Sequence, residues 1–507
     1  MIGLFNLLTT FLLAILTLGI PQASFAQEVF EAPSVQRNDP IGESVEVQKI
    51  FKKSQIANKL NIQVPPNEAE KISLGPVDYK KAKQDGRIGN SKEKALQVGI
   101  DREVEGFDKK KWRVFKAGDG RYNWRITIYS EGAAFIRPHF VKTCNCDGDI
   151  YIYGTKGIES VEGPLNHERL SKTGFWGPIV EGEYLFIEVI QYSDTVPPSL
   201  TIDVINHGFR NIQTGGITDP FLLKSDVAKE SWCYRDVNCY SDWANKKTAV
   251  ARYVFQKGPR SSACTGTMLN DQAGSFKNWF LTAHHCIDSE SVANTVIAYF
   301  RYWTNTCNGT APSLGTLPKV EGASYRAGAD STTGTDFALL ELNSSPPSGT
   351  YYLGWTTSDV STGSAVTGIH HPGGSYQRIS FGTVTGSDSN YWIVRWNTSS
   401  TEGGSSGSAL FVNSTGQIIG QLFGGDASCD NIWGTDEYGK FGVSWNLGLS
   451  SYLGGSTPSV RSPVYRFFNT STGTHFYTIS TAERDHVRNT YPQFRYEGEA
   501  FYAFTSR

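Results

Sequence analysis

The sequence predicts a chain dominated by β-strands, and its composition and local pattern both support this. Among its 507 residues are 52 glycines, 24 tyrosines and 12 tryptophans, and aromatic residues favour strands over helices. Between residues 230 and 453, short apolar runs are separated by Gly, Ser, Asn or Pro, which is typical of β-sandwiches and barrel pairs. We therefore expect mostly antiparallel sheet.

The expected strands of this region are short and follow each other closely. They are 252–255, 265–269, 279–282, 296–302, 337–342, 365–370, 377–384, 391–396, 409–412, 418–423 and 441–445. Upstream, runs such as 124–129 and 184–189 predict a small β domain over about 112–205. Residues 27–102 have few aromatics and many charges, so we expect loose or helical structure there.

The N-terminus predicts export. An apolar core at 11–20 precedes Ala-Ser-Phe-Ala at 23–26, which is a small-residue cleavage pattern. No Lys or Arg lies near Met1, so an N-terminal membrane anchor is the alternative. Eight cysteines with only two methionines suit an oxidising compartment, either extracellular or periplasmic. The net charge of -2 gives no reason to expect nucleic acid as a partner, or a membrane once the signal is removed.

Three motifs in the β-rich region supply the parts of a nucleophilic triad. They are Thr-Ala-His-His-Cys at 282–286, Thr-Asp-Phe at 335–337 and Gly-Ser-Ser-Gly-Ser at 404–408. A serine hydroxyl needs an imidazole to take its proton and a carboxylate to orient that imidazole. The order His, Asp, Ser excludes the α/β-hydrolases, in which Ser comes first and His last.

Ser406 is the expected nucleophile. Gly404 and Gly407 allow a sharp turn, so the amides of Gly404 and Ser406 can point at one spot and form an oxyanion hole. Asp336 begins an apolar run, where a partly buried carboxylate can hold an imidazole tautomer. The histidine pair at 284 and 285 is also compatible with a metal site. No carboxylate or third histidine follows at the spacing of zinc ligands, so we expect no metal.

With these motifs and Gly-Ile-His-His-Pro at 368–372, the chain resembles the chymotrypsin-fold (trypsin-like) serine peptidases, most closely the secreted bacterial lysyl endopeptidases. The resemblance spans about 232–453. It implies two antiparallel six-stranded β-barrels and a serine endopeptidase that cuts polypeptides after Lys, or after Lys and Arg, without a cofactor. It also selects His285 as the catalytic base over His284, while His370 and His371 are expected to be structural.

The resemblance further implies substrate contacts and disulfides. Phe423, Gly424 and Gly425 would pair with an extended substrate, although this family often has His where Phe423 stands. Asp436 would bind a cationic side chain, with Asp426, Asp430 and Glu437 as rivals. The implied disulfides are Cys264–Cys286, Cys239–Cys307 and Cys233–Cys429, which leave Cys144 and Cys146 unassigned.

The expected order of domains is a signal peptide (1–26), a β-rich propeptide (27–229), a trypsin-like peptidase domain (230–455), and a linker with a short aromatic module (456–507). The propeptide would cover the cleft or assist folding until cleavage, for which Lys229 is the expected site. Ser405 stands where trypsin-type zymogens carry the Asp of their activation switch, so that switch is absent. The C-terminal module either binds a polymer or a cell surface, or only packs.

Two other functions stay open at this point. The first is a secreted binding protein with an inactive protease fold, and the second is a different hydrolase such as an esterase. Covalent labelling of Ser406 separates the first from an enzyme, and cleavage of lysyl peptides separates the second from a peptidase.

Overall fold

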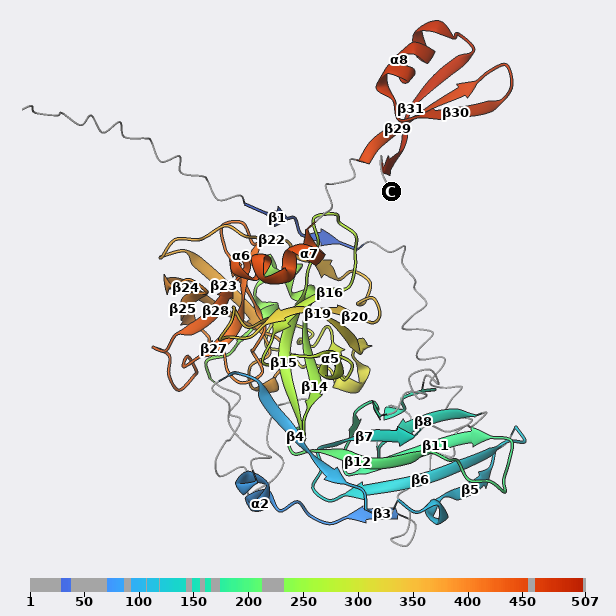
Figure 1. Cartoon of the computed structure of the whole chain (residues 1–507), viewed down its shortest axis with the longest axis vertical. Coiled ribbons are helices and arrows are strands. Elements are labelled where there is room, and N and C mark those ends of the chain that lie inside the picture. The colour runs from blue at the N-terminus through green and yellow to red at the C-terminus, as the bar shows by residue number, and fades with distance from the viewer. Residues whose placement is uncertain are drawn as a thin grey trace, which may run out of the picture.

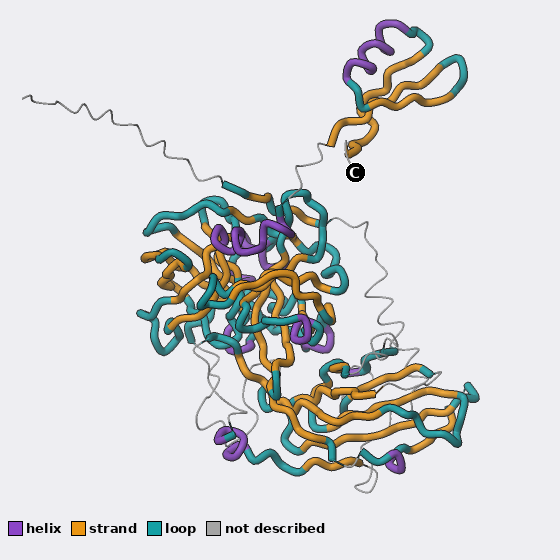
Figure 2. Tube along the Cα trace, viewed as in Figure 1, coloured by secondary structure: helices purple, strands orange, loops and turns teal. Residues whose placement is uncertain are grey.

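The computed structural model describes residues 29–37, 71–85, 93–211, 232–454 and 461–504, with gaps inside 93–211 at 106, 118, 143–147, 156–159 and 166–173. The expected signal peptide, Lys229, Cys144 and Cys146 lie outside the described residues. Strands dominate the described chain (Figures 1 and 2). None of its described helices is both long and apolar enough to cross a membrane.

Residues 232–454, here called the double-barrel region, contain one closed barrel. Its six strands pair in a ring of antiparallel ladders, from β23 through β24, β25, β28, β27 and β26 and back to β23. They are β23 (Ala365–His370), β24 (Arg378–Ser387), β25 (Tyr391–Thr398), β26 (Ala409–Val412), β27 (Ile418–Gly425) and β28 (Asp436–Lys440). Two-residue strands β13 (Arg235–Asp236) and β22 (Trp355–Thr356) add to β24 and β27.

The other half of this region is a half-barrel. Its strands pair in the order β18, β17, β14, β15, β16, β20 and β19. They are β14 (Val250–Lys257), β15 (Arg260–Met268), β16 (Trp279–Ala283), β17 (Ile297–Tyr299), β18 (Lys319–Glu321), β19 (Ala323–Ala329) and β20 (Phe337–Leu342). The two edge strands are consecutive and meet at Gly322, whose φ of +74° bends the chain. The predicted pair of antiparallel barrels is therefore confirmed as one closed six-stranded barrel and one half-barrel, whose edge strands β18 and β19 follow each other across Gly322.

One predicted strand is wrong. Residues 441–445 begin a C-terminal helical segment composed of α6 (Phe441–Ser444), a π-helical turn (Trp445–Leu449) and α7 (Ser450–Leu453). The buried apolar residues of this segment are spaced by four, which is a helical period; they are Phe441, Trp445, Leu449 and Leu453. The strand prediction rests on residues 441–445 alone, which are too few to show this period.

Residues 71–211, here called the N-terminal region, form the predicted small β domain. One sheet has the order β3, β6, β11, β8, with β5 beside β6, and a second has β10, β7, β12, β4, with β9 beside β7. The first comprises β3 (Lys71–Leu74), β5 (Arg113–Lys116), β6 (Tyr122–Ser130), β8 (Asp149–Tyr153) and β11 (Tyr184–Gln191). The second comprises β4 (Leu96–Glu103), β7 (Phe135–Lys142), β9 (Phe175–Trp176), β10 (Val180–Glu181) and β12 (Thr201–Gly208). Buried Ile126, Ile187, Ile136 and Phe140 fill the space between the sheets. A short helix, α2 (Tyr79–Gln84), lies upstream of β4.

Strand β4 joins the N-terminal region to the half-barrel. It pairs with β12 on one edge and with β15 on the other, so the two regions share one continuous sheet (Figure 1). The expectation of loose or helical structure up to residue 102 is therefore wrong for this stretch. Val98 and Ile100 are fully buried, and their partner strands come from far along the chain, which a local reading of charge density does not detect.

A second short segment also crosses to the double-barrel region. Residues 29–37, here called the N-terminal strap, contain β1 (Glu31–Ala32), which pairs with β22, and β2 (Val35–Gln36), which pairs with β21 (Tyr351–Tyr352). Ala32 is buried, and the ring of Phe30 stacks on Trp445 at 5.1 Å between centroids.

The C-terminal module, residues 461–504, is a three-stranded sheet with one helix. Its elements are β29 (Arg461–Asn469), β30 (Thr474–Thr478), α8 (Thr481–Thr490) and β31 (Phe494–Phe504). Tyr465, Phe467 and Val487 form a small buried cluster. Tyr465 and Phe467 thus have a packing role, whereas Tyr477, Tyr491 and Phe501 are exposed. A polymer or surface ligand for the module stays a prediction.

Three disulfides are present in the described chain, and they are the pairs that the resemblance implied. Cys264–Cys286 links β15 to the turn after β16. Cys239–Cys307 links the segment before β14 to the loop after β17. Cys233–Cys429 links the start of the double-barrel region to the loop before β28. Cross-links of this kind restrict the unfolded chain and so favour the folded one.

Asp101 makes the shared sheet sensitive to pH. Its Oδ1 accepts hydrogen bonds of 2.8 Å from Asn206 and from Gln256, one on each side of the contact. Burial raises the pKa of Asp101 to about 6, against the opposing effect of these bonds and of nearby His139 and Arg137. The folded state therefore binds this proton more tightly than the unfolded state, and stability is lost as pH rises from about 4 through about 6.

We expect Asp101→Asn to weaken this pH dependence, because the neutral amide resembles the protonated acid. The rise of about two units in the pKa of Asp101 changes the free energy of unfolding by about 3 kcal/mol at most between low and high pH. Melting midpoints are measured at pH 4 and pH 8 in a Ser406→Ala background. From pH 4 to pH 8, the melting midpoint of the Ser406→Ala protein should fall more than that of the protein with both Ser406→Ala and Asp101→Asn. Equal pH dependence of the two proteins would contradict this expectation.

Candidate active site

His285 lies in the turn after β16, between two other predicted site residues. Its Nδ1 is 2.7 Å from Asp336 Oδ2, and its Nε2 is 2.8 Å from Ser406 Oγ. The backbone amide of His285 also donates to Asp336 Oδ1 at 2.9 Å. The structure therefore brings together the three side chains that the motifs named, and His285 rather than His284 occupies the central place.

Asp336 is held in an unusual backbone conformation just before β20. Its φ is +59°, in the left-handed region, and its carbonyl accepts from the amide of His284 at 2.9 Å. Burial raises the pKa of Asp336, and the hydrogen bonds from His285 oppose that rise. A buried carboxylate in this position can orient the imidazole and stabilise it when it becomes charged.

The loop at 404–408 needs its two glycines. Gly404 has a φ of +97° and Gly407 a φ of +81°. A Cβ at Gly407 would lie 2.1 Å from Thr282 Oγ1, and one at Gly404 would lie 2.6 Å from the His371 carbonyl oxygen. Only glycine allows this close approach, and it places Ser406 against His285.

His370 supports the same loop, a role that the sequence reading missed. Its Nδ1 is 2.8 Å from Ser405 Oγ, and its Nε2 is 2.9 Å from Ser380 Oγ. Burial lowers the pKa of His370 well below its ordinary value, so the ring is neutral and bridges two hydroxyls. His371 is also buried, and burial lowers its pKa to about 3. The prediction that these histidines are structural agrees with these contacts.

Asp436 lies at the base of a buried site near Ser406. Its Oδ2 accepts from Trp396 Nε1 at 2.7 Å and from the Thr401 hydroxyl. Gly425 pairs with it across β27 and β28, and a Cβ there would lie 2.6 Å from Asp436 Oδ1. The rivals Asp426, Asp430 and Glu437 are all exposed. Nothing in the sequence singled out Trp396 or Thr401 as partners of this carboxylate.

The side chain of Lys94, from the N-terminal region, fills this site. Its ammonium contacts Asp436 Oδ1 and donates to the Ala427 carbonyl at 2.7 Å and to Thr401 Oγ1 at 2.5 Å. These are three acceptors for the three donors that an ammonium carries. Lys94 is only 8% exposed and Asp436 is fully buried.

The backbone around Lys94 lies along the same site. The amide of Gly404 donates to the Lys94 carbonyl oxygen at 2.6 Å, which is the contact expected of an oxyanion-hole donor. For the amide of Ser406, the second predicted donor, no acceptor is found in the described part of the chain. Glu93 forms an antiparallel bridge with Gly424, as the predicted strand-like pairing of a substrate requires.

Phe423 lies beside the imidazole. Its ring centroid is 6.2 Å from that of His285 at an interplanar angle of 75°, and 5.5 Å from that of Tyr391. It therefore forms an aromatic wall beside His285, and its contact with a substrate stays a prediction.

One group of potential metal ligands occurs in the described residues, and it does not suit a metal ion. Cys264, His285 and Cys286 have ligand atoms within 4.8 Å of one another. The two sulfurs are bonded to each other, and both ring nitrogens of the histidine are already 2.7 to 2.8 Å from Asp336 and Ser406 oxygens.

Comparisons with known proteins indicate the reaction class of this chain. Residues 227–439 match the family model for the lysyl endopeptidase C-terminal domain. The curated lysyl endopeptidase of Pseudomonas aeruginosa is 26% identical over 328 residues, which cover 61% of this chain and 70% of that protein. The chain is a serine endopeptidase that resembles the lysyl endopeptidases. Residues 431–507 of the endopeptidase also match a domain of unknown function.

Solved structures similar to the endopeptidase are also proteases. The Rv3671c protease of M. tuberculosis in its active form is 17% identical, with a TM-score of 0.29, and the match covers 46% of this chain and 95% of that chain. An HtrA-type protease with a bound tripeptide is 18% identical, with a TM-score of 0.29, and covers 44% and 66%.

Proposed function

We propose that this serine endopeptidase cleaves peptide bonds after lysine through an acyl-enzyme on Ser406. Ser406 Oγ attacks the substrate carbonyl carbon while His285 Nε2 takes its proton. Asp336 accepts from Nδ1 and stabilises the imidazolium that forms. The imidazolium then protonates the leaving amine, and a water molecule hydrolyses the ester with His285 again as base.

The amide of Gly404 stabilises the tetrahedral intermediate, with the amide of Ser406 as the second donor. The 2.6 Å contact from Gly404 to a bound carbonyl supports this role. Such donors act strongly in a buried site because they are already oriented when negative charge develops on the oxygen.

Lysine specificity rests on one observation, the contact of Lys94 with Asp436. The ammonium has an acceptor for each of its donors, in Asp436, Thr401 and the Ala427 carbonyl. This arrangement supports Lys over Arg, because a planar guanidinium presents five donors in a fixed fork that three convergent acceptors do not match. A substrate whose residue before the cleaved bond is uncharged would leave Asp436 buried and unpaired. Such a substrate binds poorly, because burying an unpaired charge is costly.

The same proposal includes export and a precursor form. Residues 1–26 are a signal peptide, residues 27–229 a propeptide, and the active enzyme works outside the cytoplasm. The three disulfides support an oxidising compartment. The contact of Lys94 with the site supports a precursor in which residues before 229 cover the cleft.

Mass spectrometry of peptides from a denatured protein digest tests this function. The processed enzyme, after the N-terminal region is removed, should cut after Lys and much less after Arg. Fluorophosphonate labelling should modify Ser406 in the same sample. Abundant cuts after other residues would contradict the role of Asp436, whereas an unlabelled and inactive protein would favour a binding protein on a protease fold.

A further inference from the structure

The N-terminal region enters the active site in the direction of a substrate. Lys94 places its side chain on Asp436 and its carbonyl oxygen at the amide of Gly404. Glu93, just before it, pairs with Gly424. After Lys94, the chain continues into β4, which pairs with β15. Leu96 lies opposite Ala263, and Ile100 lies opposite Arg260. A peptide chain therefore crosses the site with the bond between Lys94 and Ala95 at its centre.

We propose that the Lys94–Ala95 bond is a self-cleavage site, and that the N-terminal region is a substrate-like inhibitor whose two parts stay bound after the cut. This inference rests on the proposed lysine-specific triad chemistry. It adds a cleavage site that differs from Lys229, and it assigns Lys94 as the residue that blocks the enzyme.

The chemical step is the ordinary one applied within one chain. Ser406 Oγ forms an ester with the Lys94 carbonyl carbon, the bond to the Ala95 nitrogen breaks, and His285 delivers the serine proton to that nitrogen. Water then attacks the ester and leaves a carboxylate on Lys94 and a free amine on Ala95. Only water is consumed.

The part that begins at Ala95 is covalently continuous with the double-barrel region, and the shared sheet holds its new N-terminus at the site. β4 keeps its ladders with β15 and β12 after the cut, because neither ladder includes the broken bond. Ser261 on β15 donates to Asn206 Oδ1 on β12 at 2.6 Å. Arg137 on β7 donates to the Thr295 carbonyl at 2.8 Å. The new amine therefore stays beside the acyl-enzyme, where it competes with water and reverses the reaction.

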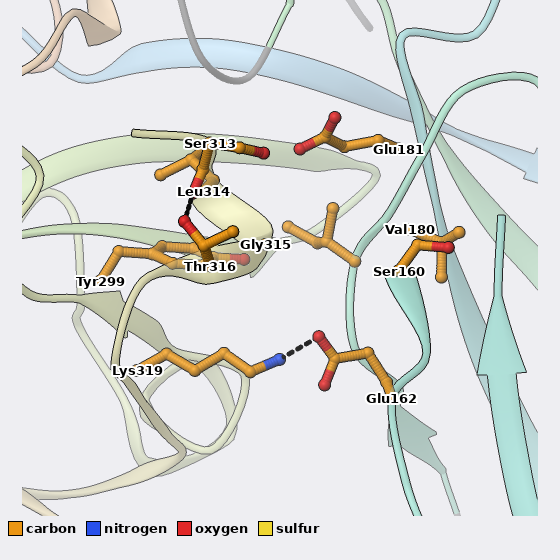
Figure 3. Close-up of a pocket in the computed structure, with 11 residues that line it drawn as sticks. Ser160, Glu162, Val180, Glu181, Tyr299, Ser313, Leu314, Gly315, Thr316 and Lys319 are labelled. Carbon is orange, nitrogen blue, oxygen red and sulfur yellow. Dashed lines mark hydrogen bonds and ion pairs between the residues drawn. The ribbon is translucent and has the colours of Figure 1, made fainter. Parts of the chain in front are cut away.

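A second contact holds the same part further from the site. Lys319 of β18 pairs with Glu162 at 2.8 Å (Figure 3). It also pairs with Glu321 of the same strand at 3.0 Å. Lys319 and Glu162 line a small pocket between the two regions, with Val180 and Leu314 on its apolar walls (Figure 3). The two carboxylates raise the pKa of Lys319 despite its burial, so the ammonium is charged and the ion pair is maintained at neutral pH.

The part that ends at Lys94 is retained by other contacts. Its N-terminal strap pairs with β22 and β21 on the double-barrel region, and Phe30 stacks on Trp445. At its other end the Lys94 side chain remains in the buried site on Asp436. A cut at Lys94 alone therefore leaves a nicked and still inhibited complex.

Four variants of the full chain test this inference by mass spectrometry after denaturation. The unmodified chain should yield a fragment that begins at Ala95, whereas Ser406→Ala, Lys94→Gln and Ala95→Pro should not. Proline at 95 removes the secondary amide of the broken bond but leaves the Lys94 side chain unchanged. Lys83→Gln is the matched control, because Lys83 is an exposed lysine of α2, and it should be cut like the unmodified chain.

Native size-exclusion chromatography and activity give the second readout. The two fragments should elute together, and this nicked complex should be inactive on a short lysyl peptide until the N-terminal region is removed. Ala95→Pro should stay inhibited without a nick. Lys94→Gln should raise the residual activity of the precursor at least about tenfold, because the inhibitor loses its buried charge contact.

An intact Lys94–Ala95 bond in a chain that matures and cuts lysyl peptides would overturn the inference and leave the proposed function standing. A fragment that begins at Ala95 in the Ser406→Ala protein, or separate elution of the two fragments, would overturn it as well. A processed enzyme that does not cut after lysine would instead overturn the proposed function.

Discussion

Replacing Ser406 with alanine is expected to lower kcat for lysyl peptides by on the order of 10^6-fold, as the loss of a nucleophile does in other serine proteases. His285→Ala should cost about as much, and the double variant little more than either single one, because the two residues act as one unit through their 2.8 Å contact. The measurement is steady-state hydrolysis of a lysyl peptide amide, after the N-terminal region has been removed by an unrelated protease that is then inhibited.

The control for this prediction is Ser414→Ala, an exposed serine on the turn between β26 and β27, which should leave kcat unchanged. If the loss of kcat in the double variant equalled the product of the two single losses, Ser406 and His285 would not act as one unit. An equal effect of Ser414→Ala would point to misfolding rather than chemistry.

Replacing Asp436 with asparagine is expected to lower kcat/KM for lysyl peptides by about 10^2- to 10^4-fold, since breaking a buried ion pair costs about 3 to 5 kcal/mol. Asparagine keeps the size and one acceptor oxygen but removes the charge that meets the lysine ammonium. The neighbours Trp396 and Thr401 both donate to Asp436 Oδ2, so the substituted side chain remains hydrogen-bonded and the fold is expected to persist.

Asp430→Asn is the matched control, because Asp430 is exposed and lies in the loop before β28. It should change kcat/KM for lysyl peptides little. Substrates with an uncharged residue at the cleavage position should lose far less activity than lysyl substrates in the Asp436 variant. A uniform loss over all substrates would assign Asp436 a structural role instead of a role in specificity.

The sequence predicts the candidate triad because each of its three residues lies in a short motif with recognisable chemistry, and the structure brings the three side chains together. The two histidines at 284 and 285 were separable only through the family pattern, and the structure agrees by placing the ring of His285 between Asp336 and Ser406. Ser405 indicates in the sequence only that the trypsin-type activation switch is absent. Its hydrogen bond with His370 is not predictable from the sequence, because residues 370 and 405 meet only in the folded chain.

The errors in the fold prediction have the same origin. Residues 441–445 alternate Phe, Val and Trp with Gly and Ser, as a strand does, but the buried apolar positions continue at a helical spacing to Leu453. Residues 96–103 follow a charged stretch and still form a strand, because β12 and β15 supply hydrogen-bond partners from more than 100 residues away.

The sequence by itself determined the strand-rich class and the serine endopeptidase class. It also predicted His285, Asp336 and Ser406 as the candidate triad and Asp436 as the candidate lysine-binding acid, because short motifs and local pattern encode them. Only the tertiary structure decided that Lys94 occupies the site of Asp436. That contact joins residues 342 positions apart. It depends on a shared sheet whose ladders form only when both regions are folded, so no local property of Lys94 distinguishes it from the other lysines of the N-terminal region.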